Sequence, residues 1–443
     1  MGKKKKPGKG SGKAGVEDRP LDTRPKAASR TSSAEEEAHS DDEVNSEATH
    51  LSLDDDMESV MGEDALPEVD EETEVTESQE AILEAKMSEN LDNATHKNSN
   101  VRLAALKNLQ ALLSLYYAPE LVEKWKMTLA DCAERSLKKG NTKEALIAVK
   151  LVALLALQLG VDAADLISKL LNVLRPQCAD ASLNPDFRAE CCTVLGLCNF
   201  VAVDEIEPLL QSTKVLLSVW QSVKSGNSPP ETQSLYVAAV AAWALLCAQV
   251  PSSRRLEEFI QSDLPKLCLY FESNHVEIRI AAGETLCVLY ELAIDLDSNF
   301  RPPNHQQTLD MLAMLSTDSL KYRAKKERRI QRSSFRQIFT AIKEEEQPSL
   351  KIKFGNETLV LDTWVRKVFY DVSCTALRSG INAHLKHNLM LREIFGLGPP
   401  LDGAAVLRQY SKTERLAIQS SISKARTLHR GKQRDKRVAN FDA

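Results

Sequence analysis

Apolar residues recur at helical spacing over most of the chain from about Gln79 to Asp297. Within this region a segment rich in small and branched apolar residues returns five times, and successive copies begin about 41 to 50 residues apart. The copies begin at Asn100, Thr142, Asp186, Tyr236 and Glu277. A period near this length, with two helices in each unit, is typical of HEAT and armadillo arrays. The pattern therefore predicts an all-α, armadillo/HEAT-like helical-repeat solenoid.

The first and last copies match position by position, and both carry an arginine, Arg102 and Arg279. We expect these arginines to form bonds between neighbouring repeats rather than to bind nucleic acid. Turn-forming sequences separate the units, among them Gly140-Asn141, Gly160 and Asn184-Pro185. The small residues of each copy let one helix lie close to the next, while leucines and valines at helical spacing fill a continuous core.

After the array the pattern changes twice. Residues 350–361 alternate around Gly355-Asn356, which predicts a short β-hairpin. A single helix is expected from Asp362, as N-cap, to about Leu385, followed by a short element at Leu389–Phe395. Near the end, Ser411 and Glu414 have the spacing of a capping box, and no Gly or Pro follows until Gly431. The sequence therefore predicts a small C-terminal region with a short β-hairpin and a long terminal helix.

Composition divides the chain into four parts. We expect 1–80 to be a disordered basic tip followed by an acidic, Ser-rich segment, 81–300 the helical repeats, 301–400 a C-terminal domain, and 401–443 a basic helix and tail. Low hydrophobicity and high charge give the first part too little apolar surface to offset the entropy of ordering. Ser33 and Ser40 precede acidic residues, so we hypothesise that kinases directed to acidic sites phosphorylate them.

The net charge of −6 conceals two regions of opposite sign. Residues 31–85 hold 21 of the 63 acidic residues and no Lys or Arg, which leaves 57 basic against 42 acidic residues elsewhere. Two clusters hold much of the excess. The first contains Lys321, Arg323, Lys325, Lys326, Arg328, Arg329 and Arg332, and the second contains Lys424, Arg426, Arg430, Lys432, Arg434, Lys436 and Arg437. Such patches indicate binding to a polyanion, and without a base-reading motif we expect recognition of RNA shape and backbone.

Motifs for catalysis and metal binding are missing from the sequence. The chain has no phosphate-binding Gly-rich loop, no nucleophile elbow and no Cys-x-x-Cys pair among its nine cysteines, so we expect no enzyme, no cofactor and buried, reduced thiols. His384 and His387 are expected on an ordinary polar surface, and the four tryptophans in the core. The longest apolar runs are short for a bilayer and no secretory signal begins the chain, so we expect no membrane association.

Several stretches resemble the interferon-related developmental regulator family over about residues 80–443. They are Met127–Gly140, Arg279–Leu286, Leu315–Lys325, Gln331–Arg336, Ile352–Gly355, Phe395–Pro400 and Arg434–Arg437. The resemblance implies an armadillo-like fold without catalysis. It also implies binding to inactive ribosomes, with the helical body over the transfer-RNA sites and the C-terminal helix in the messenger-RNA channel. In the terminal stretch, Gly431 departs from the family's more uniformly basic helix, and a glycine costs about 1 kcal/mol within a helix.

Our leading hypothesis is therefore a cytoplasmic, ribosome-binding translational repressor. The terminal cluster would contact phosphates in the messenger channel, and the first cluster would contact ribosomal RNA or else a transfer RNA. The alternative, which the resemblance also implies, is a nuclear transcriptional co-regulator whose concave solenoid face binds partner proteins. An importin-like adaptor is a third option, but the exposed Trp/Asn ladder that it needs is not found.

Overall fold

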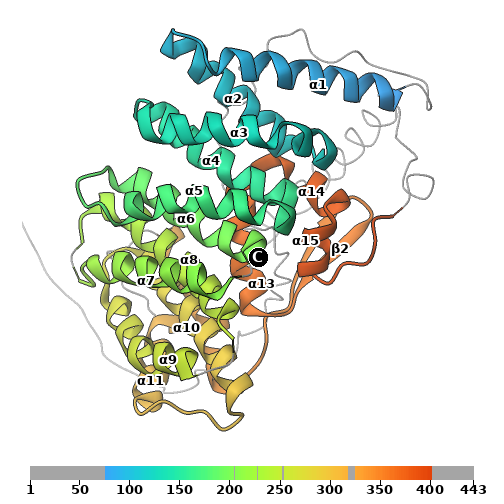
Figure 1. Ribbon diagram of the computed structural model, residues 1–443. Helices are drawn as coiled ribbons and strands as arrows, with labels where there is room; N and C mark the ends of the chain where they lie inside the picture. The colour runs from blue at the N-terminus through green and yellow to red at the C-terminus, as the bar shows by residue number, and fades with distance from the viewer. Residues whose placement is uncertain (1–74, 204, 227, 252–253, 318–324, 402–443) are drawn as a thin grey trace, which may run out of the picture. The chain divides into compact units, whose positions relative to one another are not determined.

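The computed structural model describes residues 75–401, except 204, 227, 252–253 and 318–324. Most of these residues belong to helices that follow one another as antiparallel pairs (Figure 1). The pairs are α1 (Val75–Asn93) with α2 (Ser99–Leu115), α3 (Pro119–Lys139) with α4 (Thr142–Leu159), α5 (Ala164–Ala179) with α6 (Pro185–Ala202), α7 (Ile206–Ser222) with α8 (Gln233–Gln249), α9 (Arg254–Cys268) with α10 (Val276–Leu296), and α11 (His305–Thr317) with α12 (Lys325–Glu344). The predicted helical-repeat solenoid is confirmed, and its stacking continues beyond residue 300 into the pair α11–α12.

The even-numbered helices form one continuous layer, which we call the inner layer. Each of α2, α4, α6, α8, α10 and α12 contacts the next, and the contact between α6 and α8 is the most extensive. Gly196 makes this close approach possible, because a Cβ atom added there would lie 2.5 Å from the Cβ of Ala242. The small residues of the repeats thus act as predicted, by letting neighbouring helices pack at short range.

Polar side chains join neighbouring repeats within this layer. Arg102 donates to both carboxylate oxygens of Glu144, at 2.9 and 3.2 Å, and so ties α2 to α4. Arg279, only 1% exposed, donates from Nε to Gln331 Oε1 at 3.0 Å and ties α10 to α12. Both arginines therefore have the structural role that the sequence predicted. Because an arginine buried without partners is costly, the bond to Gln331 offsets the burial of Arg279.

The predicted turn-forming residues lie at helix ends. Asn141 caps α4 by accepting a hydrogen bond from the backbone N–H of Glu144 at 2.9 Å, and Asn184 caps α6 in the same way. Gly160 ends α4 with φ at 59°, in the left-handed region that favours glycine. Short 3₁₀ turns complete several connections, namely Gly160–Ala163, Pro230–Thr232, Leu269–Glu272 and Arg378–Gly380.

The C-terminal region begins with the predicted hairpin. Strands β1 (Leu350–Phe354) and β2 (Glu357–Leu361) pair antiparallel around Gly355-Asn356. The single helix predicted from Asp362 to Leu385 is wrong. Over this range the chain instead forms α13 (Trp364–Leu377) and α14 (Ile381–His387), and it breaks where Arg378 adopts a φ of 50°. The element predicted at Leu389–Phe395 is confirmed as α15 (Leu389–Ile394). Thr363 rather than Asp362 caps α13, because its hydroxyl accepts from the backbone N–H of Arg366.

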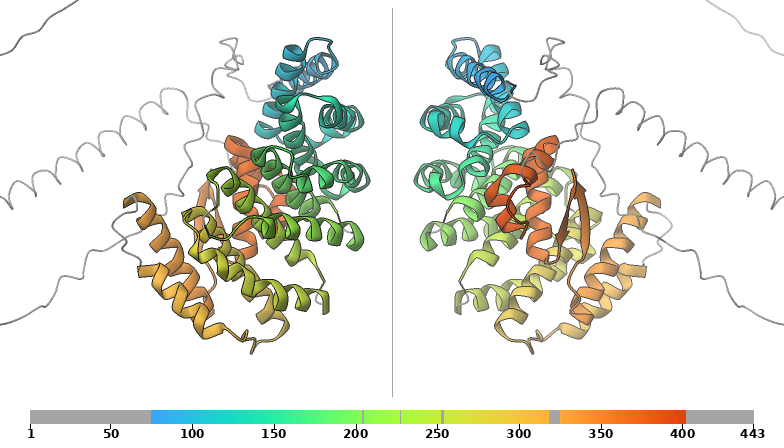
Figure 2. Two further views of the ribbon diagram at one scale, coloured as in Figure 1. Left: turned by 90° about the vertical axis from the view of Figure 1, so that its left-hand side faces the viewer. Right: turned by 90° about the vertical axis from the view of Figure 1, so that its right-hand side faces the viewer.

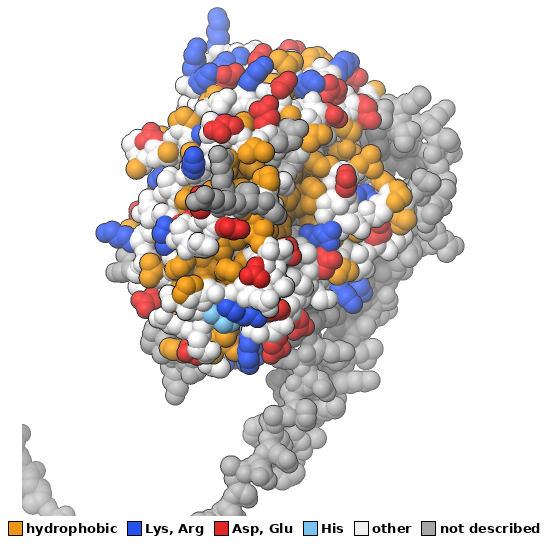
Figure 3. Space-filling view, turned by 60° about the horizontal axis from the view of Figure 1, so that its bottom comes forward, with side chains coloured by type: hydrophobic (Ala, Val, Ile, Leu, Met, Phe, Trp, Pro, Cys, Tyr) orange, Lys and Arg blue, Asp and Glu red, His pale blue; other side chains and the backbone are white. Residues whose placement is uncertain are grey.

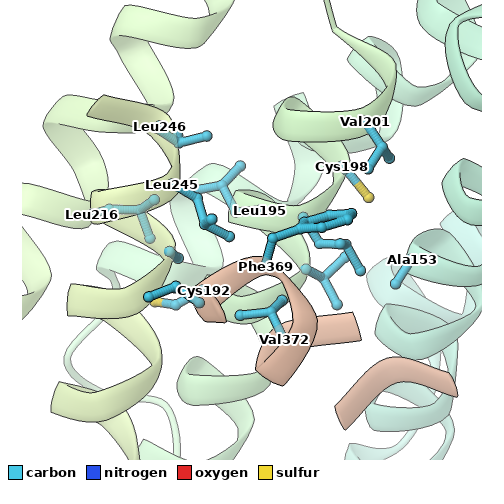
Figure 4. Close-up of a cluster of buried hydrophobic side chains, with 14 of the residues drawn as sticks. Ala153, Cys192, Leu195, Cys198, Val201, Leu216, Leu245, Leu246, Phe369 and Val372 are labelled. Atoms are coloured by element: carbon cyan, nitrogen blue, oxygen red, sulfur yellow. The ribbon is translucent and has the colours of Figure 1, made fainter. Parts of the chain in front are cut away.

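Helix α13 packs across the inner layer and touches α2, α4, α6, α8 and α10 (Figures 1 and 2). Phe369 is fully buried, and its ring stacks on Phe200 with the centroids 4.8 Å apart. Figure 4 shows Phe369 and Val372 pointing from α13 into apolar side chains of the stack. They lie among Leu195, Cys198, Val201, Leu245 and Leu246. Helix α13 therefore covers this face of the array from α2 to α10.

The cysteines and most of the tryptophans lie in the core, as the sequence predicts. All nine cysteines are free and buried or half-buried, and Trp220, Trp243 and Trp364 are buried while Trp125 is half-buried. Residues 142–179 and 230–249 are apolar and long enough to cross a membrane by length and composition alone, contrary to our expectation of their length. Within the most apolar 18 residues of each segment, 72% and 56% of the residues are nevertheless buried inside the helical stack.

Candidate nucleic-acid interface

Helix α12 carries the part of the first cationic cluster that the structure describes. One face of the helix is fixed to the array, because Phe335, Ile338 and Ile342 are buried there and Gln331 binds Arg279. Gly283 of α10 leaves room for this contact, since a Cβ atom added to it would lie 2.7 Å from Ile338 Cδ1. The helix is thus a rigid support whose other face is available for charged side chains.

The cations lie on the faces turned away from this contact. Lys326 and Arg329 are exposed, and Arg328 and Arg332 are half-buried, with Arg332 Nε donating to the backbone oxygen of Arg328 at 3.3 Å. Lys325 begins the helix, but its side chain is not among the described ones. Two further members of the predicted cluster, Lys321 and Arg323, lie outside the described residues.

The basic face is longer than the predicted cluster. Arg336 and Lys343 are also exposed, and they continue the helical spacing that starts at Lys325. We call Lys325, Arg329, Arg332, Arg336 and Lys343 the α12 stripe. Sequence reasoning missed the last two residues because it followed charge density and stopped where the cations became sparse. The spacing of four, three, four and seven residues along one helix would have found them.

Among the residues that the structure describes, no acidic side chain pairs with the cations in the N-terminal part of this stripe. In the part of the chain that the structure describes, no carboxylate forms an ion pair with Lys326, Arg328, Arg329, Arg332 or Arg336. Cations at the start of a helix also face the positive end of its dipole, an unfavourable arrangement that a bound anion relieves. Glu327 is the single acidic residue in the first turn of α12. The geometry and the charge together suit a phosphate backbone.

A groove beside the stripe lies between α12, the 347–350 connection and α13. Its volume is about 310 Å³, and it is lined by Arg336, Thr340, Ser349 and Lys367 among others. Lys367 adds little free charge, because its Nζ lies 2.8 Å from Glu284 and 3.1 Å from Asp371. Burial alone would lower the pKa of Lys367, but these two carboxylates outweigh it and raise the pKa. Arg336 is thus the cation that this groove contributes to the interface, and Glu346 adds a negative charge at its other end.

An acidic pocket follows at the C-terminal end of α12. This smaller cavity, about 120 Å³, is lined by Glu291, Glu345 and Glu346 among others. Burial raises the pKa of Glu291 to about 7, although its carboxylate accepts a hydrogen bond from the backbone N–H of Trp364 at 2.7 Å. A nucleic-acid backbone would be repelled here, so the acidic pocket sets a limit to the cationic surface.

The second cluster cannot be placed. All seven of its cations and the predicted terminal helix lie outside the described residues, which end at Leu401. On the face of the described fold shown in Figure 3, acidic and basic side chains are interspersed, and apolar side chains form a band across the middle. That face therefore has no broad region of one sign, in contrast to the α12 stripe.

The histidine expectation was wrong for one residue. His384 is fully buried against the ring of Tyr117, with the centroids 5.7 Å apart, whereas His387 is exposed as expected. Burial lowers the pKa of His384 to about 4, so this imidazole is neutral and belongs to the contact between α14 and α2. Within the described ranges, no three His, Cys, Asp or Glu side chains come together in a way that could hold a metal ion.

Paired helices stacked in two layers, with a cationic stripe on the last pair, define a helical-repeat protein of the armadillo/HEAT class. Sequence comparison narrows this class. The family model "Interferon-related developmental regulator" matches residues 27–343, and a second, "Interferon-related protein conserved region", matches residues 388–438. The chain belongs to the interferon-related developmental regulator family. The match begins at residue 27, earlier than the residue 80 expected from the resemblance, and the two regions include every cation of both clusters.

Individual relatives agree with this assignment. Interferon-related developmental regulator 1 of Sus scrofa is 36% identical over 368 residues, which cover 80% of this chain and 81% of the relative. Interferon-related developmental regulator 2 of Mus musculus is 35% identical, with 82% and 84% covered. Interferon-related developmental regulator 1 of Homo sapiens is 35% identical, with 80% and 81% covered. These relatives are named as regulators, and the helical fold described here accords with a regulator that acts by binding.

Proposed function

We propose that this chain is a translational repressor that binds inactive ribosomes in the cytoplasm. In this proposal the helical body lies over the transfer-RNA sites, the α12 stripe contacts ribosomal RNA or a transfer RNA, and the C-terminal segment enters the messenger-RNA channel. The observation that carries the proposal is the α12 stripe, a row of cations on a rigid helix whose N-terminal part has no acidic partner among the described residues.

The physical argument is electrostatic. Each Lys or Arg that neutralises a phosphate releases condensed counterions, so binding strengthens as salt falls. A stripe spaced along one helix face holds the backbone positions of its cations fixed, so binding orders their side chains but not the helix that carries them. Family membership supports a regulator, and the ribosome as target follows from the resemblance described above.

The nuclear co-regulator remains the alternative function, and the fold narrows the form that it can take. That hypothesis used the concave face of the solenoid as the partner-binding surface. Helix α13 occupies the inner layer from α2 to α10, with Phe369 fully buried. A protein partner of this chain would therefore bind the outer helices or displace α13. Cell fractionation separates the two functions, because an exclusively nuclear protein with no ribosomal fraction favours the co-regulator.

Co-sedimentation with ribosomes through sucrose gradients tests the proposal. The variant Arg329→Ala/Arg332→Ala/Arg336→Ala should bind about tenfold or more weakly, and the slope of log affinity against log salt should fall by about 2–3. The matched control removes three exposed lysines from other helices, Lys107→Ala/Lys139→Ala/Lys143→Ala, and should leave both quantities near wild type.

A second variant tests the C-terminal segment. A chain that ends at Ile422 lacks all seven terminal cations and should also lose ribosome binding. If both the triple-arginine variant and the shortened chain sediment with ribosomes as the wild type does, the proposal is wrong.

A further inference from the structure

An acidic segment of the same chain matches the α12 stripe in charge. Residues 51–74, immediately before α1, contain eleven Asp or Glu and no Lys or Arg. The stripe and its flanking cations, Lys326 and Arg328, form no ion pair with a carboxylate at the N-terminal part of α12 within the described residues. At long range, a cationic surface attracts a row of carboxylates and a row of phosphates in the same way.

The segment is also long enough to reach the stripe. Its attachment point is Val75, at the start of α1, and α12 lies at the other end of the inner layer, five helix-to-helix steps from α2. At about 8–10 Å for each step, the separation is roughly 40–50 Å. Twenty-four residues can extend to about 80 Å. Covalent attachment then holds the carboxylates near the stripe at a local concentration in the millimolar range.

We propose that residues 51–74 bind the α12 stripe and compete there with RNA. The segment would then occupy the same surface to which the proposed function assigns RNA binding. The inference rests on the proposed function only because both use this surface. The stripe is favoured over the terminal cluster as the docking site, because its cations are held on a helix anchored by Phe335, Ile338 and Gln331. An anion bound there also relieves the crowding of positive charge at the start of α12.

The expected size of the competition follows from mass action. At a local concentration of about 1 mM, a segment whose dissociation constant is taken as about 0.1 mM makes the bound form outweigh the unbound form about tenfold. The apparent affinity for RNA is reduced by the same factor. Neutralising the eleven Asp and Glu to Asn and Gln should therefore tighten RNA binding about tenfold at low salt. The gain should disappear at about 1 M salt, where the Debye length is about 3 Å.

The test uses the full chain and two independent readouts. In the first, the photo-crosslinking residue p-benzoylphenylalanine replaces Val60, and the crosslinks are mapped by mass spectrometry. They should fall within residues 325–344. They should be lost in the charge-reversed variant Arg329→Glu/Arg332→Glu/Arg336→Glu, whose fold is checked by circular dichroism. In the second readout, anisotropy of a fluorescein-labelled RNA hairpin should report the tenfold gain of the neutralised chain, and no gain when the stripe is also reversed.

Each result decides the inference. Crosslinks confined to other parts of the chain, crosslinks that survive reversal of the stripe, or an unchanged RNA affinity after neutralisation overturn it. If Val60 crosslinks to α12 while ribosome binding does not depend on the stripe, the intramolecular contact stands and the RNA-binding role proposed for the stripe fails. If the stripe is needed for ribosome binding but no crosslink reaches α12, the function stands and the intramolecular contact fails.

Discussion

The substitution Phe369→Ala tests whether α13 is a fixed part of the fold. Phe369 is fully buried between α13 and the inner layer, where its ring lies 4.8 Å from Phe200 and 5.3 Å from Phe395, centroid to centroid. Truncation to alanine removes the ring from both aromatic contacts and leaves a cavity beneath the helix. The side chains on the other side belong to several repeats, so the cavity cannot close by a local movement of α13 alone.

The magnitude follows from this burial. Removing a fully buried aromatic ring costs about 2–3 kcal/mol in transfer free energy, and the unfilled cavity raises the total to about 3–5 kcal/mol. Because α13 belongs to a short C-terminal region, we expect most of this loss as local undocking. A loss of 3–4 kcal/mol raises the population of the undocked state by a factor of about 10²–10³, since each 1.4 kcal/mol is tenfold.

Hydrogen–deuterium exchange measured by mass spectrometry is the assay. Peptides that cover residues 364–377 should exchange about 10²–10³ times faster in the variant, while peptides from α1 should be unchanged. Val360→Ala is the matched control, because Val360 lies on the hairpin with its side chain 39% exposed and should change exchange little. Equal exchange of these peptides in the Phe369 variant and in the control would refute the docking of α13 described here.

Three further substitutions test other parts of the fold. Gly196→Ala places a Cβ atom 2.5 Å from that of Ala242 and should cost about 1–3 kcal/mol in urea denaturation, because α6 and α8 must move apart. Arg279→Ala removes the buried hydrogen bond that Gln331 Oε1 accepts and should cost about 2–3 kcal/mol in the same assay. The pKa of Glu291 is raised from 4.5 to about 7 in the folded state. Its contribution to the free energy of unfolding is therefore fully present below pH 4.5 and is lost as the pH rises through 7. Glu291→Gln stays neutral at every pH, so its thermal midpoint should match wild type at about pH 4.5 and exceed it above pH 7.

Local sequence patterns predicted the paired helices, the bonds of Arg102 and Arg279, and the hairpin around Gly355. They failed where distant contacts decide the structure. The break after α13 is marked in the sequence only by Gly380, and the reason for that glycine is tertiary, because a Cβ atom added to it would lie 1.7 Å from the backbone oxygen of Ser114 in α2. In the same way, the burial of His384 depends on α2, about 270 residues earlier in the chain. Periodicity shows that a helix has a buried face but not which element covers it.

The candidate interface was predicted in part. The first cluster was found from its charge. Its extension to Arg336 and Lys343 depends on which face of α12 packs on the array, and the burial of Phe335 and Ile338 defines that face. The acidic pocket that borders the stripe could not be predicted. Glu291 belongs to α10 and Glu346 follows α12, and only the tertiary fold places them beside one cavity.

The position of α13 has a consequence for how this family can vary in length. In an open array each unit meets only its two neighbours, so evolution can duplicate or delete units without disturbing the others. Here α13, a single helix of 14 residues, contacts five helices of the inner layer. An inserted or deleted helix pair would move some of these five helices out of contact with α13. The contacts of α13 thus constrain how many repeats can precede it.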